Sequence, residues 1–222
     1  MDIVNAIKTR TSIRAFLPQA VPREIIREIL EAAIRTPSAV NTQPWEIMVV
    51  TGEVLDHISR DNMNNFKSGV PVNEHSDYFG IYRQRRIELA KDIFKLMDIQ
   101  REDLEKREDW TLRGFRFFDA PVAIFLAADK SLREGTMALY DLGAISQTIC
   151  LAALNYGLGT CIEEQGVKYP DVVRKYTGIS EDKDLIMSIA IGYPDTEFPA
   201  NQLVSRRMTV DEVTTWLGYE AL

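Results

Sequence analysis

Residues 37–45 read Pro-Ser-Ala-Val-Asn-Thr-Gln-Pro-Trp and separate an amphipathic helical pattern from the first strongly apolar strand pattern. Pro37 and Pro44 each bias the preceding residue away from helical dihedral angles, so the helix before this stretch is expected to end there. Between the prolines, amide and hydroxyl side chains have no regular element to satisfy them. They could grip a flat polar ligand, and an ordinary helix-to-strand loop explains the same residues equally well.

Helices and strands follow on both sides of this stretch. Apolar residues recur with the helical period from Pro22 onward, residues 46–51 predict a buried strand, and residues 53–66 predict a helix. The further elements expected are short helices at residues 2–8, 170–176 and from Thr209, where a capping box occurs, and strands at residues 121–128, 160–164 and 184–192. This order indicates one domain over residues 1–222 with an α+β fold, an α/β/α sandwich whose mixed sheet is flanked by helices.

A long charged segment interrupts the strands at residues 67–118. It comprises a polar loop followed by two charged helical patterns, and it is longer than most connections between strands. Such a helical excursion could form a lid or a wall near an active site, or a solvated hairpin at one edge of the fold.

The most apolar helical pattern covers residues 136–156 and leaves almost no polar stripe. A helix that is apolar on all sides must be covered on all sides, which predicts either a central core helix or a subunit interface.

Composition excludes several classes of protein. The chain has 222 residues, a formal charge of -7 and a pI near 5.0, which argues against nucleic acid as a partner because phosphate neutralisation needs a basic surface. We expect no secretory signal and no segment long enough to span a membrane. Cys150 and Cys161 do not form a Cys-x-x-Cys motif, so a reduced, cytoplasmic protein is expected.

The sequence contains few of the residues and motifs that other kinds of catalytic or phosphate-binding site require. His57 and His75 are the only histidines, which nearly excludes a histidine-based metal site or a Ser-His-Asp triad. Neither a Gly-x-Gly-x-x-Gly motif after a strand nor a Walker sequence occurs, so a Rossmann or P-loop phosphate site is not indicated.

Two clusters of hydroxyl and guanidinium groups lie far apart in the chain, at Arg10-Thr11-Ser12-Ile13-Arg14 and at Ser205-Arg206-Arg207. Guanidinium groups bind phosphate with two parallel hydrogen bonds, and hydroxyl groups fill the remaining acceptor positions. Two such clusters in an acidic protein suggest one shared phosphate, whereas solvated basic turns are the plainer alternative.

Taken together with residues 37–45 and the Gly157-Leu158-Gly159-Thr160 helix exit that leads to Glu163 and Glu164, these clusters resemble the flavin-dependent nitroreductase family. The resemblance runs from Asp2 to the last helix. The Phe-Phe-Asp-Ala-Pro-Val segment at residues 117–122 and the charged excursion before it look most like the branch that contains bacterial nitrobenzoate reductases.

The resemblance implies an FMN-binding homodimer with active sites shared between subunits and the helix at residues 136–156 at the dimer core. It implies that the FMN phosphate is held by Arg10, Ser12 and Arg207, with help from Arg206. The other cofactor-binding residues that it implies are Thr11 and Arg14 on the phosphate, ribityl chain or ring edge, Pro37, Ser38, Ala39 and Asn41 from the opposite subunit, Gln43 close by, and Glu163 and Glu164 along the ring.

Three details refine this expectation. The Glu164 backbone N–H would point at flavin N5. Other branches carry lysine where Ser205 stands, so the phosphate must rely here on Arg206 and Arg207. Arg116 stands where some relatives place a cation near the flavin pyrimidine edge.

The activity implied by the resemblance is NAD(P)H-dependent reduction of a small aromatic compound by a ping-pong mechanism, with NADPH or NADH as the donor and a nitroaromatic, such as a nitrobenzoate, or a quinone as the acceptor. The chain lacks a convincing copy of the Glu, Tyr and Lys set of reductive dehalogenases, although Glu74, Tyr78, Tyr82 and Lys91 keep a dehalogenase or flavin-modifying enzyme open. A non-catalytic flavin-binding module is the remaining alternative. No residue is assigned a catalytic role.

Overall fold

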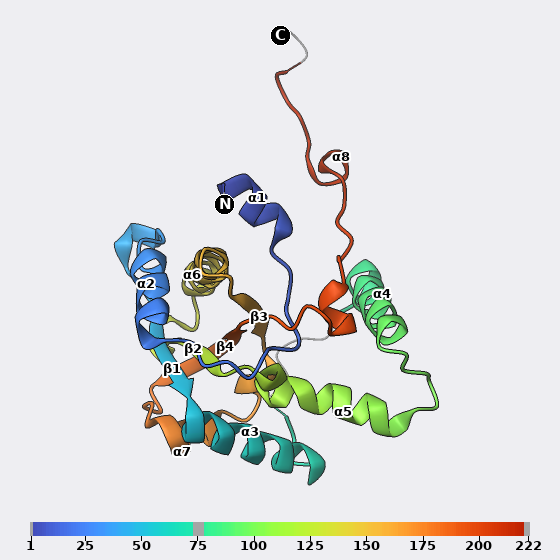
Figure 1. Cartoon of the computed structure of the whole chain (residues 1–222). Helices are drawn as coiled ribbons and strands as arrows, with labels where there is room; N and C mark the ends of the chain where they lie inside the picture. The colour runs from blue at the N-terminus through green and yellow to red at the C-terminus, as the bar shows by residue number, and fades with distance from the viewer. Residues whose placement is uncertain (1, 73–77, 220–222) are drawn as a thin grey trace.

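The structure is a computed structural model that describes residues 2–72 and 78–219, so Glu74 and His75 lie outside the described residues. Figure 1 shows a central sheet between layers of helices, with the helical excursion to one side. Short 3-10 helices connect several of the longer elements. They are η1 (Ala39–Asn41), η2 (Phe117–Asp119), η3 (Lys130–Leu132), η4 (Gln165–Val167) and η5 (Pro199–Gln202).

The sheet contains four named strands in the order β1-β2-β4-β3, all paired antiparallel. These strands are β1 (Glu46–Thr51), β2 (Val122–Asp129), β3 (Gly159–Glu163) and β4 (Lys183–Gly192). An isolated parallel bridge joins Ser12 to Thr160 at the open edge of β3. The N-terminal segment therefore adds a parallel pairing to an otherwise antiparallel sheet.

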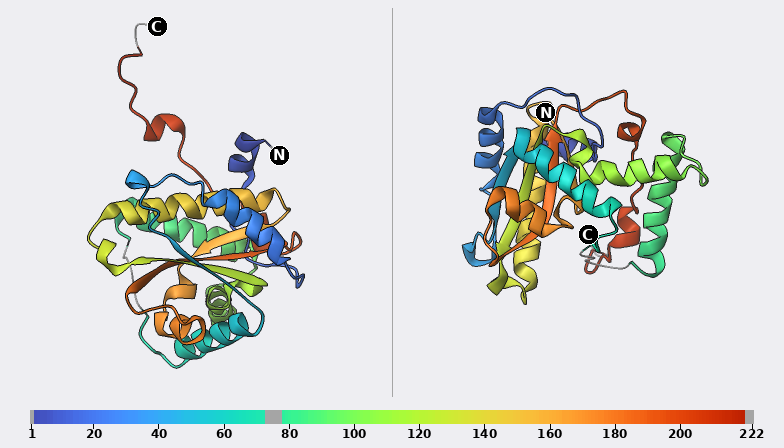
Figure 2. Two further views of the ribbon diagram at one scale, coloured as in Figure 1. Left: turned by 90° about the vertical axis from the view of Figure 1, so that its left-hand side faces the viewer. Right: turned by 90° about the horizontal axis from the view of Figure 1, so that it is seen from below.

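Helices cover both faces of the sheet, as Figure 2 shows from two sides. Within β2, Ile124 and Leu126 pack with α2 (Arg23–Ala33) and α6 (Thr136–Leu154), whereas Phe125 belongs to the cluster on the other face. That second layer consists of α3 (Gly52–Lys67), α5 (Leu104–Phe115) and α7 (Pro170–Thr177). The alternation follows the two-residue period of a strand, and it confirms the α/β/α sandwich.

The ends of the helices follow their capping signals. Pro22 is the N-cap of α2, and Gly178 ends α7 with a φ of 71°, a conformation that glycine adopts at no steric cost. Thr209 forms the expected capping box with Glu212, but α8 (Val210–Val213) is only one turn long. The helix predicted from Thr209 is therefore confirmed at its start and is short, because the side chains of Val210 and Val213 are exposed rather than packed.

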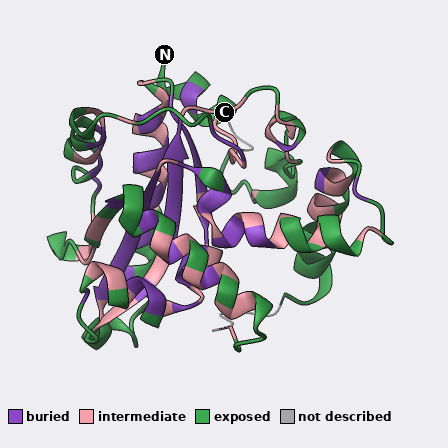
Figure 3. Ribbon diagram, turned by 60° about the horizontal axis from the view of Figure 1, so that its bottom comes forward, coloured by how far each residue is buried: buried purple, intermediate pink, exposed green. Residues whose placement is uncertain are grey.

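One expectation about burial needs correction. Only Val50 of β1 is buried, since β1 is an edge strand and Val49 is 43% exposed. The helix α6 is covered on one side within the chain, with Leu142 and Ile149 in the core and Tyr140 73% exposed, which is compatible with the subunit interface that the sequence analysis left open. Figure 3 shows the burial concentrated in the strands and in the helix sides that face them.

The expectation that no segment could span a membrane also needs correction. Thr136–Leu154 is long and apolar enough to do so by length and composition, with a mean hydropathy of 1.4. However, this helix packs on the sheet and on α2, and the core helix of a soluble protein passes the same test. This packing explains the apolar residues on the buried side of the helix.

The excursion consists of α4 (Gly80–Leu96) and α5, and only α5 joins the main core. Phe115 of α5 is buried against Phe66 and Tyr169, which fixes this helix to the sandwich. In contrast, α4 buries only Ile93 and lies against η5 near the C-terminal segment. Therefore α4 forms a wall beside the sandwich (Figure 1).

Candidate functional site

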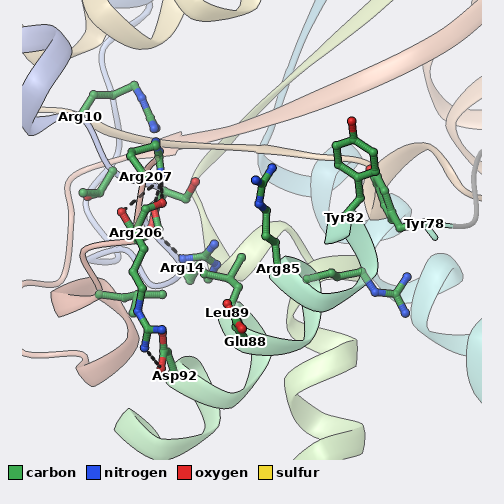
Figure 4. A pocket seen from close by; sticks show the side chains of 15 residues that line it. Arg10, Arg14, Tyr78, Tyr82, Arg85, Glu88, Leu89, Asp92, Arg206 and Arg207 are labelled. Atoms are coloured by element: carbon green, nitrogen blue, oxygen red, sulfur yellow. Dashed lines mark hydrogen bonds and ion pairs between the residues drawn. The ribbon is translucent and has the colours of Figure 1, made fainter. Parts of the chain in front are cut away.

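A cavity of about 510 Å³ lies where the N-terminal segment, the C-terminal segment and α4 meet. Figure 4 shows the side chains that line it. They are Arg10, Thr11, Ser12 and Arg14 from the first segment, Leu203, Ser205, Arg206 and Arg207 from the second, and Tyr78, Tyr82, Arg85, Arg86, Glu88, Leu89 and Asp92 from α4 and the residues before it. Two clusters separated by about 190 residues in the sequence thus share one cavity, as the sequence predicts.

The sheet positions the first cluster. The Ile13 N–H donates to the Thr160 carbonyl over 2.9 Å, beside the Ser12–Thr160 bridge. A Cβ on Gly159 would lie 2.5 Å from Ile13 Cγ1, so only glycine allows this segment to lie so close to β3. The Arg14 N–H donates to Asn201 Oδ1 over 2.6 Å, which attaches the first cluster to η5.

Neighbouring residues fix the guanidinium groups of the second cluster. Arg207 Nη1 donates to Ser205 Oγ over 2.7 Å and to the Arg206 carbonyl over 2.9 Å. Arg206 Nη2 lies 3.2 Å from Asp92 Oδ1 on α4. Thus Ser205 positions Arg207, and Arg206 joins the C-terminal segment to the wall formed by α4.

The cavity is strongly basic in a protein of net charge -7. Six arginines and two carboxylates line it, a formal surplus of four positive charges. Within residues 2–72 and 78–219, neither Arg10 nor Arg207 forms an ion pair with a carboxylate, whereas Arg206 does. A set of guanidinium and hydroxyl donors without anionic partners fits the phosphate of FMN.

The stretch at residues 37–45 does not line this cavity. It carries backbone strain, because Val40, Asn41 and Gln43 have φ values of 44°, 61° and 48°. Val40 is β-branched, for which this left-handed conformation is rare, and its side chain is 96% exposed. Residues with strained backbone conformations cluster at active sites and ligand clamps.

Interactions within the chain hold this strained loop. The buried carboxylate of Asp141 on α6 accepts from the Ala39 N–H at 3.3 and 3.1 Å. The Ser38 hydroxyl accepts from the Gln43 N–H over 2.9 Å. The loop therefore presents Val40 and Asn41 to the outside in a defined conformation, with Pro37 also exposed.

The two acids at the end of β3 have different surroundings. Glu163 is 7% exposed, and its carboxyl group accepts from the Ser188 hydroxyl over 2.7 Å and from the Gly166 N–H over 3.0 Å. Burial raises the pKa of Glu163 to about 8, while these two hydrogen bonds act in the opposite direction. Glu163 therefore holds the turn at residues 163–166, and it is not at an exposed strand end.

Glu164 lies half-buried in the wall of a second cavity, of about 970 Å³, between β4 and the N-terminal part of α6. Tyr78 lines both cavities. The arginine clusters and Glu164, which the resemblance assigns to one cofactor, thus lie in adjoining cavities within one chain.

The excursion was expected as a lid or wall near an active site, but which residues of α4 face the cavity was not predicted from the sequence. Tyr82, Arg85, Leu89 and Asp92 recur at three- and four-residue intervals, which places them on one side of a helix. That spacing could have identified the face, but the charged residues all around α4 masked it. The role of Asp141 was also missed, because an acid in an apolar helix has no sequence signal for its partner.

Two residues weighed in the sequence analysis take other roles or positions. Arg116 does not line the cavity, and its guanidinium group pairs with Asp119 at 2.8 Å and with Asp109 at 3.1 Å. Lys91 is exposed on α4 and lies outside both cavities. Within the described residues, the candidate dehalogenase set therefore does not assemble around either cavity, although Tyr78 and Tyr82 line the first.

The cysteines are not poised for reaction. Cys150 and Cys161 are free and buried, and burial raises the pKa of Cys161 to about 12. Among residues 2–72 and 78–219, no three histidine, cysteine, aspartate or glutamate side chains gather in a way that could hold a metal ion.

Comparisons with known proteins give a consistent result. The model of the family described as "Nitroreductase family" matches residues 7–193. The nitrobenzene nitroreductase of Ectopseudomonas oleovorans is 31% identical over 97% of this chain and 96% of its own, and a 4-nitrobenzoate reductase of Nocardioides sp. is 29% identical over 95% and 88%.

Solved structures of nitroreductases have the same fold as this chain. The FMN- and NADPH-dependent nitroreductase NfnB from Sphigopyxis sp. strain HMH superposes with a TM-score of 0.92 at 29% identity, covering 99% of this chain and 100% of that one. The FMN-dependent nitroreductase NfnB from Mycobacterium smegmatis, solved in complex with NADPH, gives 0.89 at 28% identity, covering 97% and 100%.

Proposed function

The chain belongs to the nitroreductase family, and from this premise we propose that it is an FMN-dependent oxidoreductase that uses NAD(P)H to reduce a small nitroaromatic compound or a quinone. The observation that carries this proposal is the meeting of the Arg10–Arg14 and Ser205–Arg207 segments at one cavity. Neither segment alone could surround a phosphate, and the fold brings them together by docking the first on β3 and the second on α4.

The phosphate of FMN would bind to the side chains of Arg10, Ser12 and Arg207. Arg10 and Arg207 supply two positive charges, and charge-assisted hydrogen bonds of this kind are worth roughly 1.5–3 kcal/mol each. Arg206 would help mainly through its ion pair with Asp92, because it neutralises a carboxylate that lines the same cavity. Thr11 and Arg14 line the same cavity and would contact the ribityl chain.

The rest of the cofactor would extend toward Glu164 through the region that Tyr78 borders. FMN, when bound, supplies the redox chemistry by accepting hydride from the nicotinamide and passing it to the acceptor. The chain binds and orients the reactants. The Glu164 backbone N–H would face flavin N5, and the carboxyl group of Glu163 fixes the turn that carries it.

The active site would be completed by a second copy of the chain. Residues 37–43 form a strained and exposed loop that does not reach the cavity of its own chain, which supports their contributing Pro37, Ser38, Ala39 and Asn41, with Gln43 nearby, to the partner's site. Exposed apolar side chains on α1 (Ile3–Thr9) and α6, such as Ile3, Ile7 and Tyr140, support the same homodimer. We place the protein in the cytoplasm, because reduced cysteines suit that compartment.

Initial-rate kinetics test the order of binding. In a ping-pong mechanism, donor and acceptor occupy the same site in turn, so double-reciprocal plots for NADPH at several concentrations of a nitroaromatic acceptor should give parallel lines. Intersecting lines would contradict the ping-pong order. A protein that consumes no NADPH with any nitroaromatic or quinone would instead favour a non-catalytic flavin-binding module.

A further inference from the structure

The basic cavity has more positive charge than one phosphate needs. A phosphate monoester carries a charge of roughly -1.5 to -2 at neutral pH, whereas the arginines and carboxylates that line the cavity leave a surplus of four positive charges. Part of this surplus therefore remains after FMN has bound, and it favours a second ligand that is itself an anion.

The N- and C-terminal segments supply four of the six arginines, and α4 supplies the other two together with both carboxylates. Arg85 and Arg86 line the cavity, while Arg83 of the same helix is exposed and does not. Figure 4 shows Arg85 between Arg207 at one end of the cavity and Tyr82 at the other. The Arg85 guanidinium carbon lies 5.9 Å from the centre of the Tyr82 ring.

The charge of Arg85 is available to a ligand. Its Nη2 donates to the sulfur of Met208, a neutral and weak acceptor, and within the described residues it forms no ion pair with a carboxylate. Glu212 is the acid that interacts with it electrostatically, but the Glu212 carboxylate already accepts hydrogen bonds from Thr209. Glu88 accepts from Gln84.

An aromatic face beside an available guanidinium group suits one kind of small molecule, a planar ring that bears a carboxylate. The ring can pack on a tyrosine, and the carboxylate can accept two parallel hydrogen bonds from the arginine. Building on the function proposed above, we propose that Arg85 and Tyr82 bind an aryl carboxylate, so that this enzyme prefers acidic nitroaromatic acceptors to neutral ones.

The test compares 4-nitrobenzoate with nitrobenzene, which have the same ring and nitro group and differ by the carboxylate. Arg85→Met should lower the ratio of kcat/KM for 4-nitrobenzoate to that for nitrobenzene by about tenfold, since a charge-assisted hydrogen bond is worth at least about 1.4 kcal/mol. Arg83→Met removes the same charge from the exposed side of α4, and it should leave the ratio within about twofold.

Two binding measurements give readouts other than activity. Benzoate, which cannot be reduced by this chemistry, should perturb the visible spectrum of the FMN-loaded protein, and its dissociation constant should rise about tenfold in Arg85→Met and not in Arg83→Met. The dissociation constant of FMN, measured by quenching of its fluorescence, should stay within about threefold of the wild-type value in both variants, because the phosphate relies on Arg10 and Arg207.

The outcomes separate this inference from the function on which it rests. Weakened FMN binding in Arg85→Met would assign Arg85 to the binding of the cofactor phosphate. A fall in kcat/KM for NADPH without a fall for NADH would assign Arg85 to the binding of the electron donor. Either result, or an unchanged substrate ratio, would overturn the inference and leave the nitroreductase activity standing. A wild-type protein that binds no FMN would overturn both.

Discussion

Arg206 Nη2 lies 3.2 Å from Asp92 Oδ1, whereas the adjacent Arg207 hydrogen-bonds only to Ser205 and Arg206 within the described part of the chain. Two neighbouring arginines therefore differ in what they can offer an anion. The Arg206 side chain is 74% exposed, so its ion pair contributes at most about 1 kcal/mol to stability, but the pair keeps that guanidinium group directed at α4.

This difference predicts unequal effects on cofactor binding. Arg207→Met should weaken FMN binding by about ten- to a hundredfold, because it removes a charge-assisted contact with the phosphate. Arg206→Met should weaken it by less than about fivefold, because Asp92 already engages that charge. Fluorescence titration of FMN with each variant measures both values, and a larger effect of Arg206→Met would reverse the assignment.

Gly166 should tolerate no side chain. A Cβ there would lie 2.3 Å from Phe117 Cε1 and 2.4 Å from Ser188 Oγ, both in buried side chains that cannot move aside. Gly166→Ala is expected to destabilise the fold by roughly 1–3 kcal/mol through overpacking. Denaturant unfolding measures this, with Gly135→Ala as the matched control, since the nearest atom to a Cβ at Gly135 is 3.6 Å away. Equal stabilities would show that the turn at residues 163–166 adapts.

Glu163 should make stability depend on pH. Burial raises its pKa from 4.5 to about 8, so the folded state favours the protonated form. Its stabilising contribution is therefore complete below pH 4.5 and is lost as the pH rises toward 8, with a slope of at most about 1.4 kcal/mol per pH unit.

Glu163→Gln is the control for this effect, because glutamine is neutral at every pH. The free energy of unfolding of the wild type, measured in urea at intervals from pH 5 to pH 8, should fall relative to that of Glu163→Gln. Parallel pH profiles for the two proteins would show that the Glu163 carboxyl group is ionised in the folded state throughout this range.

The exposed side of α6 should hold the dimer together. Met137 and Tyr140 are 55% and 73% exposed, and they lie one helical turn apart. Tyr140→Asp would place a charge in an apolar interface and is expected to shift the protein toward monomers, as measured by size-exclusion chromatography with light scattering. A wild-type protein that is itself monomeric would refute the proposed sharing of the active site.

Much of the fold could be predicted because its signals are local. Pro22, Gly178 and the Thr209 capping box mark helix ends through their own backbone chemistry, and the period of β2 sets its two packing faces. The burial of β1 could not be predicted in this way, because an edge strand and a central strand carry the same apolar residues, and only the pairing order distinguishes them.

The residues of the candidate site were also predictable only in part. The two arginine clusters could be recognised from their composition, and the structure brings them to one cavity. The surroundings of Glu163 and the ion pair between Arg206 and Asp92 depend on elements distant in the sequence, so no local pattern announces them. Likewise, no local pattern distinguishes the arginines of α4, and only the packing of this helix decides that Arg85 and Arg86 line the cavity and Arg83 does not.

The most direct test of this account is the visible spectrum of the purified protein during two anaerobic additions, NADPH first and a nitroaromatic acceptor second. Flavin absorption bands should bleach with NADPH and return with the acceptor. A colourless protein that takes up no FMN when it is supplied would contradict the assignment of Arg10, Ser12 and Arg207 to a phosphate, and with it the proposed function.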